Sequence, residues 1–125
     1  MDTIHIIAMD LRKVMEEEER KLSPRLKNID LMGKCAIASF RLQRALHEAG
    51  FQADFVLGSF IDSDHCWVSC SGWIVDITAT QFGPFNRVYI TEYDARFIPR
   101  KLNEPALKEI AEFWPPSQKP IKQSY

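Results

Sequence analysis

The chain has 125 residues, of which 46% are hydrophobic and 26% are charged, a balance typical of a soluble globular protein. This length predicts one domain with a single modest core and leaves no room for a separate cofactor domain. Sixteen basic and seventeen acidic residues give a formal net charge of −1, so no overall field would recruit nucleic acid or an anionic membrane.

Neither a targeting signal nor a membrane span is expected. The start, Met1-Asp2-Thr3-Ile4-His5, lacks the basic end and the long apolar run of a signal peptide. No window approaches the roughly 18 apolar residues of a membrane helix. We therefore expect a cytoplasmic protein. Its three cysteines form an odd number without framework spacing and are expected to be free thiols in a reducing compartment.

Residues 2–22 predict an amphipathic helix. Its apolar residues recur at helical spacing: Ile4, Ile7, Leu11, Val14 and Met15. The acidic run Glu16 to Glu19 is expected to face water, although such a run can also bind a partner. Ser23-Pro24 ends the helix, and the segment up to Lys34 is interpreted as an irregular connection.

A second helix is predicted from Cys35 to Ala49, ended by Gly50. Cys35 then lies in the first turn, where unpaired N–H groups and the positive end of the helix dipole favour a thiolate. The alternative is a buried small hydrophobe, the commonest role of a free cysteine. His47 cannot be the base of this thiol, because it lies about 18 Å away at 1.5 Å rise per residue.

The hydrophobic pattern then changes to the alternation of strands. Strands are expected over residues 51–61, 65–70 and 73–78, with turns at residues 62–64 and at Ser71-Gly72. A turn rich in aromatic residues (80–85), a short strand around residues 87–93, a short helix (103–114) and a loose tail (115–125) complete the chain. The result is one α+β domain over residues 1–114.

Alternation divides the side chains of the second strand between two faces. His65, Trp67 and Ser69 lie on one face, and Cys66, Val68 and Cys70 lie on the other. The hairpin brings Asp76, near the middle of the third strand, alongside His65 and within reach of a hydrogen bond across the ladder. Asp76 interrupts an apolar strand, so its carboxylate needs a partner, which is either His65 or the backbone.

Cys35, His65 and Asp76 together supply the nucleophile, the base and the orienting group of a thiol enzyme. The Cys35 thiolate would attack a carbonyl carbon. His65, oriented by Asp76, would protonate the leaving amine and then activate water or a second amine. The backbone N–H of Cys35 and a second donor such as Asn28 could bind the oxyanion.

These residues also carry a resemblance to a known family. Gly33-Lys34-Cys35 leading a helix, His65-Cys66-Trp67-Val68, and the run from Trp73 to Phe82 together resemble the core of the transglutaminase-like superfamily, a branch of the papain-like cysteine enzymes. The resemblance covers about residues 30–83. It implies a papain-like fold whose catalytic helix packs on an antiparallel sheet, with Cys35, His65 and Asp76 catalytic by position. Similar small bacterial members include leader peptidases of lasso-peptide biosynthesis.

Several neighbouring residues have two interpretations each. Trp67 shares the face of His65 and either walls the site or packs in the core. Gln81 hydrogen-bonds either the loop or a substrate. Phe82, together with Phe85 and Tyr89, either lines a groove for an extended peptide or packs the loop.

A metal site is not expected. Cys66 and Cys70 are the remaining candidate ligands beside His65 and Cys35, yet alternation turns His65 away from both. Cys66 and Cys70 are therefore assigned to the core, and no metal or cofactor is required.

The sequence thus predicts a cysteine-dependent amide hydrolase or acyl transferase that acts on a peptide or protein. Two alternatives stay open. The first is a non-catalytic module on the same fold that binds a peptide along residues 82–93. The second is a deamidase or toxin-type modifier of a protein target.

Overall fold

The computed structural model describes residues 2–25 and 29–100. The chain forms α1 (Asp2–Leu22), α2 (Cys35–Glu48), β1 (Ala53–Phe60), β2 (Ser63–Cys70), β3 (Trp73–Asp76), the 3-10 turn η1 (Ala79–Phe82), β4 (Tyr89–Thr91) and β5 (Phe97–Pro99). The predicted helix 103–114, the tail 115–125 and Asn28 lie outside the described residues.

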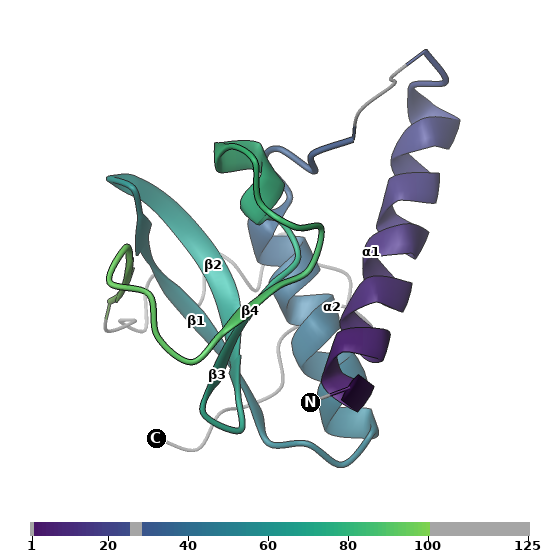
Figure 1. The fold of residues 1–125 in the computed structure, drawn as a ribbon. Helices are drawn as coiled ribbons and strands as arrows, with labels where there is room; N and C mark the ends of the chain where they lie inside the picture. Colours follow the sequence, from purple (N-terminus) through teal and green to yellow (C-terminus); the bar gives the residue numbers. More distant parts are fainter. Residues whose placement is uncertain (1, 26–28, 101–125) are drawn as a thin grey trace, which may run out of the picture.

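The architecture is α+β, as the sequence predicts. The five strands form one curled antiparallel sheet in the order β4-β3-β2-β1-β5. Helix α2 lies between this sheet and α1, so the molecule has three layers (Figure 1). The start of α2 and the η1 turn lie at the same end of the molecule (Figure 1).

Helix α1 has the predicted bounds, but its buried face differs from the prediction. The buried residues are Ile4, Ala8, Arg12, Met15 and Glu16. Val14 is exposed, whereas Glu16, expected in a solvated run, is only 5% exposed. The cause is the i,i+4 row that continues from Ile4 through Ala8, in which the Arg12–Glu16 ion pair lets two charged side chains occupy buried positions.

Helix α2 begins at Cys35 after a tight turn in which Leu31 and Gly33 adopt left-handed backbone conformations. The turn is closed by a hydrogen bond from the Lys34 N–H to the Leu31 carbonyl, at 3.0 Å. At the other end Gly50 has a φ of 91°, and the Phe51 N–H bonds to the Leu46 carbonyl. The predicted glycine stop is confirmed.

The first hairpin is tighter than predicted. The β1–β2 turn consists of Ile61 and Asp62, both with positive φ, so β2 begins at Ser63 instead of His65. Ser71-Gly72 forms the predicted second hairpin turn. Strand β3 ends at Asp76, which therefore stands at the strand end and not near its middle.

Strand β5 was not predicted. It has three residues, lies at the edge of the sheet beside β1, and ends in Pro99. A three-residue strand is too short to show an alternating pattern, and an edge position tolerates proline because one side of the strand needs no ladder hydrogen bonds.

The sheet packs on both faces. Toward α2, the core joins helix residues such as Leu42 and Leu46 to Val68, Cys70 and Val75 of the sheet. The other face carries a cluster built on Phe60, Trp67 and Phe97. The predicted alternation along β2 is confirmed, because Trp67 belongs to the second cluster and its neighbours Val68 and Cys70 belong to the first.

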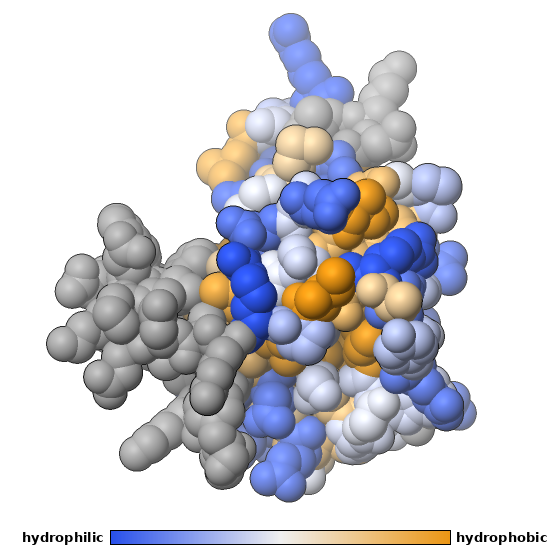
Figure 2. Space-filling view, turned by 90° about the vertical axis from the view of Figure 1, so that its left-hand side faces the viewer, coloured by the Kyte–Doolittle hydropathy of each residue, from blue (hydrophilic) through white to orange (hydrophobic). Residues whose placement is uncertain are grey.

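The surface is mixed in character. On the described part of the face shown in Figure 2, hydrophobic residues lie in separate spots between hydrophilic ones. Along the parts of the chain that the structure describes, neither helix is long and apolar enough to cross a bilayer.

Gly58 of β1 lies close against its neighbours in the sheet, and this close approach yields a stability prediction. A Cβ atom there would lie 2.2 Å from the Ile98 carbonyl oxygen and 2.6 Å from the Trp67 ring. Gly58→Ala should lower the free energy of unfolding by about 1 to 3 kcal/mol, because the backbone of β5 cannot move aside without breaking the strand pair. Urea unfolding measures this change. Ser59→Ala, at the next position of β1, is the control, and an equal effect of the two substitutions would refute the steric account.

Candidate active site

Cys35 is the first residue of α2, and its side chain is half-buried. It packs against a small cluster formed by Phe40, Phe55 and Cys66. The phenyl rings of Phe40 and Phe55 lie 4.1 Å apart between helix and strand and hold the first turn of α2 on β1 and β2. The thiol is thus fixed by packing on one side and remains partly accessible.

His65 and Asp76 form the hydrogen-bonded pair that the sequence predicts. Nε2 of His65 lies 2.6 Å from Oδ2 of Asp76, and both side chains are at most 1% exposed. The other carboxylate oxygen accepts hydrogen bonds from the backbone N–H and the hydroxyl of Thr78, at 2.8 and 3.2 Å. Asp76 therefore has both partners that were considered for it, and its own orientation is held by Thr78.

The position of Asp76 at the end of β3 explains the contact. The last pair of the β2–β3 ladder joins Val68 to Val75, so Asp76 extends one residue beyond it. Its side chain turns back toward His65, three residues before Val68 on β2. The pair is diagonal and not directly cross-strand, a separation that the long reach of an imidazole ring can span.

Aromatic rings surround His65. The ring centroids of Phe82, Phe60 and Trp67 lie 4.8, 5.8 and 6.0 Å from that of His65. This packing leaves the imidazole no exposed surface and limits the competition of water for its hydrogen bonds.

The second ring nitrogen of His65 is left for Cys35. Nε2 is engaged by Asp76, and among the described residues buried Nδ1 has no hydrogen bond of ordinary geometry. The His65–Cys35 interaction is therefore longer or less well aligned than an ordinary hydrogen bond. Such contacts commonly tighten when a substrate binds.

The histidine is held as an imidazolium. Burial alone would lower its pKa, but the hydrogen bond and charge of Asp76 and the nearby Cys35 sulfur outweigh burial and raise the pKa of His65 to about 9. At neutral pH the protonated ring lies between a carboxylate and the Cys35 sulfur, so each of its nitrogens can donate a proton.

The cysteine is held as a thiolate. The polar contact of Cys66 and, against the opposing effect of burial, the nearby charge of the His65 imidazolium lower the pKa of Cys35 to about 5. The thiol of Cys66 changes in the opposite direction, because its hydrogen bond to Cys35 and its burial raise its pKa. Near neutral pH, Cys35 is thus the nucleophilic sulfur and Cys66 keeps its proton.

Cys66 is buried in a core cluster, as the sequence predicts, and the same cluster also packs against Cys35. Alternation does turn Cys66 away from the face of His65. Helix α2, however, covers the face of Cys66 and brings Cys35 onto it. The sequence pattern shows which face of the strand a residue occupies but not which element covers that face.

The remaining predicted site residues are packed around the triad. Trp67 lies in the aromatic cluster beside His65, and Phe82 contacts both His65 and Phe60. Gln81 accepts a long hydrogen bond of 3.5 Å from the Gly33 N–H and donates to the Thr78 carbonyl at 3.1 Å. It thereby joins η1 to the turn before Cys35. Asn28, the suggested oxyanion donor, is outside the described residues.

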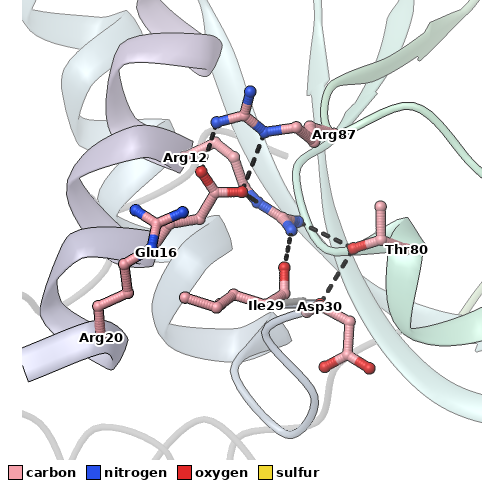
Figure 3. Close-up of a pocket in the computed structure, with 7 residues that line it drawn as sticks. All are labelled: Arg12, Glu16, Arg20, Ile29, Asp30, Thr80 and Arg87. Atoms are coloured by element: carbon pink, nitrogen blue, oxygen red, sulfur yellow. Dashed lines mark hydrogen bonds and ion pairs between the residues drawn. The ribbon is translucent and has the colours of Figure 1, made fainter. Parts of the chain in front are cut away.

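A buried arginine ties the segments around the triad together (Figure 3). The Arg12 guanidinium donates to the Ile77 carbonyl at 2.7 Å, to the Thr80 hydroxyl at 2.9 Å, and to the Ile29 carbonyl. The Thr80 hydroxyl in turn donates to the Asp30 carbonyl at 3.1 Å. The chain before Cys35 and the chain after Asp76 therefore form hydrogen bonds with the same side chain of α1.

The charge of Arg12 is balanced locally. Glu16 accepts from the Arg12 Nε at 2.9 Å and also from Nε and Nη2 of Arg87. The hydrogen bonds and charges of Arg87 and Arg12 outweigh the opposing effect of burial and lower the pKa of Glu16. Sequence reasoning missed this network, although Arg12 and Glu16 lie at the i+8 and i+12 positions counted from buried Ile4.

A pocket of about 530 Å³ borders this network (Figure 3). Its lining consists of Arg12, Glu16, Arg20, Ile29, Asp30, Thr80 and Arg87. None of the three triad residues lines it, and Arg12 and Glu16 are engaged with each other and with the backbone. The pocket is therefore separate from Cys35, His65 and Asp76. Among residues 2–25 and 29–100, no three His, Cys, Asp or Glu side chains converge as metal ligands would.

Comparisons of the chain with protein-family models, with curated proteins and with solved structures gave no match.

The acidity of Cys35 yields a testable pH dependence. Because its pKa is lowered from an ordinary 9.0 to about 5, the rate of Cys35 alkylation by iodoacetamide should rise through pH 5 and be nearly flat from pH 6 to 8. An ordinary thiol would still be rising there. Peptide mapping by mass spectrometry assigns the label to Cys35. His65→Ala should move the midpoint upward, since it removes the imidazolium, and a midpoint near 9 in the unmodified protein would contradict the thiolate assignment.

The Arg12 network yields a stability prediction. Arg12→Ala should lower the free energy of unfolding by about 3 kcal/mol, because it breaks a buried ion pair and leaves two backbone carbonyls without their donor. Urea unfolding provides the measurement. The control is Arg20→Ala, on the same helix, whose half-exposed side chain pairs with Glu17 and should contribute less than about 0.5 kcal/mol. Similar losses for both variants would show that Arg12 is not a structural anchor.

Proposed function

We propose that this chain is a cysteine-dependent amide hydrolase or acyl transferase that acts on a peptide or protein. The observation that carries the proposal is the buried hydrogen bond of 2.6 Å between His65 and Asp76, with the Cys35 thiol at the start of α2 near the same imidazole ring. A thiol, an imidazole and a carboxylate in this order are the components of a triad.

The protonation states support the same reaction. The Cys35 thiolate attacks the carbonyl carbon of an amide, and the electron pair of the C=O bond moves to oxygen. The tetrahedral intermediate collapses, the C–N bond breaks, and imidazolium His65 gives its proton to the leaving amine. Neutral His65 then takes a proton from water, or from a second amine, as that nucleophile attacks the thioester and releases Cys35.

The start of α2 is suited to stabilise the oxyanion. As the first helical residue, Cys35 has a backbone N–H without an acceptor within the helix, and this N–H lies beside its own sulfur. One such donor contributes about 3 kcal/mol to transition-state stabilisation in other enzymes. We therefore assign the Cys35 N–H as one oxyanion donor.

The arrangement also supports the finer fold assignment that we propose, a transglutaminase-like core within the papain-like class. The nucleophile begins a helix, the histidine lies near the start of a strand, and the aspartate ends the next strand of the same sheet. The order Cys, His, Asp along the chain agrees with the motifs that carry the resemblance. A deamidase would use the same groups, with ammonia as the leaving amine.

The non-catalytic alternative has less support from the described residues. Phe82, Phe85 and Tyr89, the rings expected to line a peptide groove, pack with Phe60 and with each other. A binding module would also have no use for a half-buried thiolate or for a buried imidazolium. These features favour the enzyme.

Trapping of an acyl-enzyme tests the proposal. The protein is incubated with a library of peptides, quenched in acid, and analysed by mass spectrometry for a thioester at Cys35, which identifies the acyl donor. Cys35→Ala should give no adduct. Asp76→Asn should slow its formation by about 100-fold, less than the roughly 10⁴-fold seen in serine triads, because the thiolate already exists before the attack.

The matched control is Cys70→Ala, which removes a buried thiol outside the site and should leave the adduct unchanged. Peptides that bind the protein, as seen by fluorescence of its tryptophans, without ever acylating Cys35 would favour the binding module and overturn the proposed reaction.

A further inference from the structure

We propose that Cys66 is a positioning residue of this site, whose thiol donates a hydrogen bond to the Cys35 sulfur and keeps that sulfur in its anionic form. The inference rests on the proposed function only in taking Cys35 as the nucleophile. It assigns a role to a buried thiol that the triad does not use.

The geometry brings the two sulfur-bearing side chains together from different layers. Cys66 follows His65 on β2 and points to the face that α2 covers, where Cys35 begins the helix. Both belong to the cluster with Phe40 and Phe55. The Cys66 side chain is only 4% exposed, so water hardly competes for its proton.

Cys35 packs against the cluster that contains Cys66, so the S–H and the backbone N–H of Cys66 are two donors on that side of the Cys35 sulfur. A thiol is a weak donor to a neutral acceptor. A donor facing an anion in a buried setting forms a stronger, charge-assisted bond. Cys66 therefore stabilises the thiolate from the face of β2 that α2 covers, and His65 stabilises it from the opposite face of β2.

The two thiols have separate tasks because their surroundings differ. Cys66 and His65 lower the pKa of Cys35. The anionic Cys35 and burial raise the pKa of Cys66, Asp76 raises it more weakly, and Arg100 lowers it. A sulfur next to an anion and shielded from water keeps its proton, so the pair contains one nucleophile and one donor.

The pH dependence of Cys35 alkylation in Cys66 variants tests the inference. Cys66→Ala and Cys66→Val remove the donor with different side-chain volumes, and each should raise the midpoint of the alkylation profile by about one pH unit, the order expected from loss of one charge-assisted hydrogen bond. Cys66→Ser keeps an O–H donor, so the midpoint of its alkylation profile should stay close to that of the protein with Cys66. A purely structural role would not distinguish serine from valine in this way.

Cys70→Ala is the matched control, since it removes another buried thiol from the same strand, and it should leave the midpoint unchanged. Circular dichroism establishes whether each variant folds. If Cys66→Ala does not fold, Cys66→Val is used for the comparison. An unchanged midpoint in the folded donor-less variants, with a raised midpoint in His65→Ala, would overturn the role of Cys66 and leave the triad intact. A midpoint that neither His65 nor Cys66 affects would instead refute the proposed function.

Discussion

The hydrogen bonds of the Arg12 guanidinium are the interactions on which the arrangement of the site depends. The guanidinium is buried, and its hydrogen bonds outside α1 go to two segments. It binds the chain before Cys35 through the Ile29 carbonyl, and the chain after Asp76 through the Ile77 carbonyl and Thr80. A buried cation is stable only where such acceptors and a counter-charge surround it, and Glu16 supplies that charge. The dependence is mutual, because a displacement of α1 would take away the hydrogen-bond donor that holds both segments.

The triad is built from one local and one long-range component. His65 and Asp76 are eleven residues apart on the β2–β3 hairpin, so their hydrogen bond can form once this hairpin exists. Cys35 reaches them only when α2 packs on the sheet, through contacts such as that of Phe40 with Phe55. The chemistry of the sulfur is therefore a property of the docked layers and not of α2 alone, whose N-terminal dipole is a weaker influence than the neighbouring imidazolium.

Sequence reasoning could predict those features that repeat along the chain. The helical periods give both helices nearly residue by residue, the Ser71-Gly72 pair gives a hairpin, and alternation gives the faces of His65 and Trp67. Features set by a single contact between distant segments were missed. Strand β5 is too short to show a pattern, and the burial of Glu16 depends on Arg87, 71 residues further along the chain. The contact of Cys66 with Cys35 depends on the docking of α2, which no local signal reports.

The enclosure of His65 has a consequence for how protons enter and leave the site. Phe60, Trp67 and Phe82 surround the ring, and Asp76 occupies Nε2. Among the described residues, the direction left to Nδ1 is toward Cys35, the half-buried member of the triad. In the reaction proposed for this site, protons and the substrate would therefore approach the histidine by the same route. The histidine would exchange its proton with the group bound at the sulfur, so an acyl group there would shield the acid from solvent until the second nucleophile arrives.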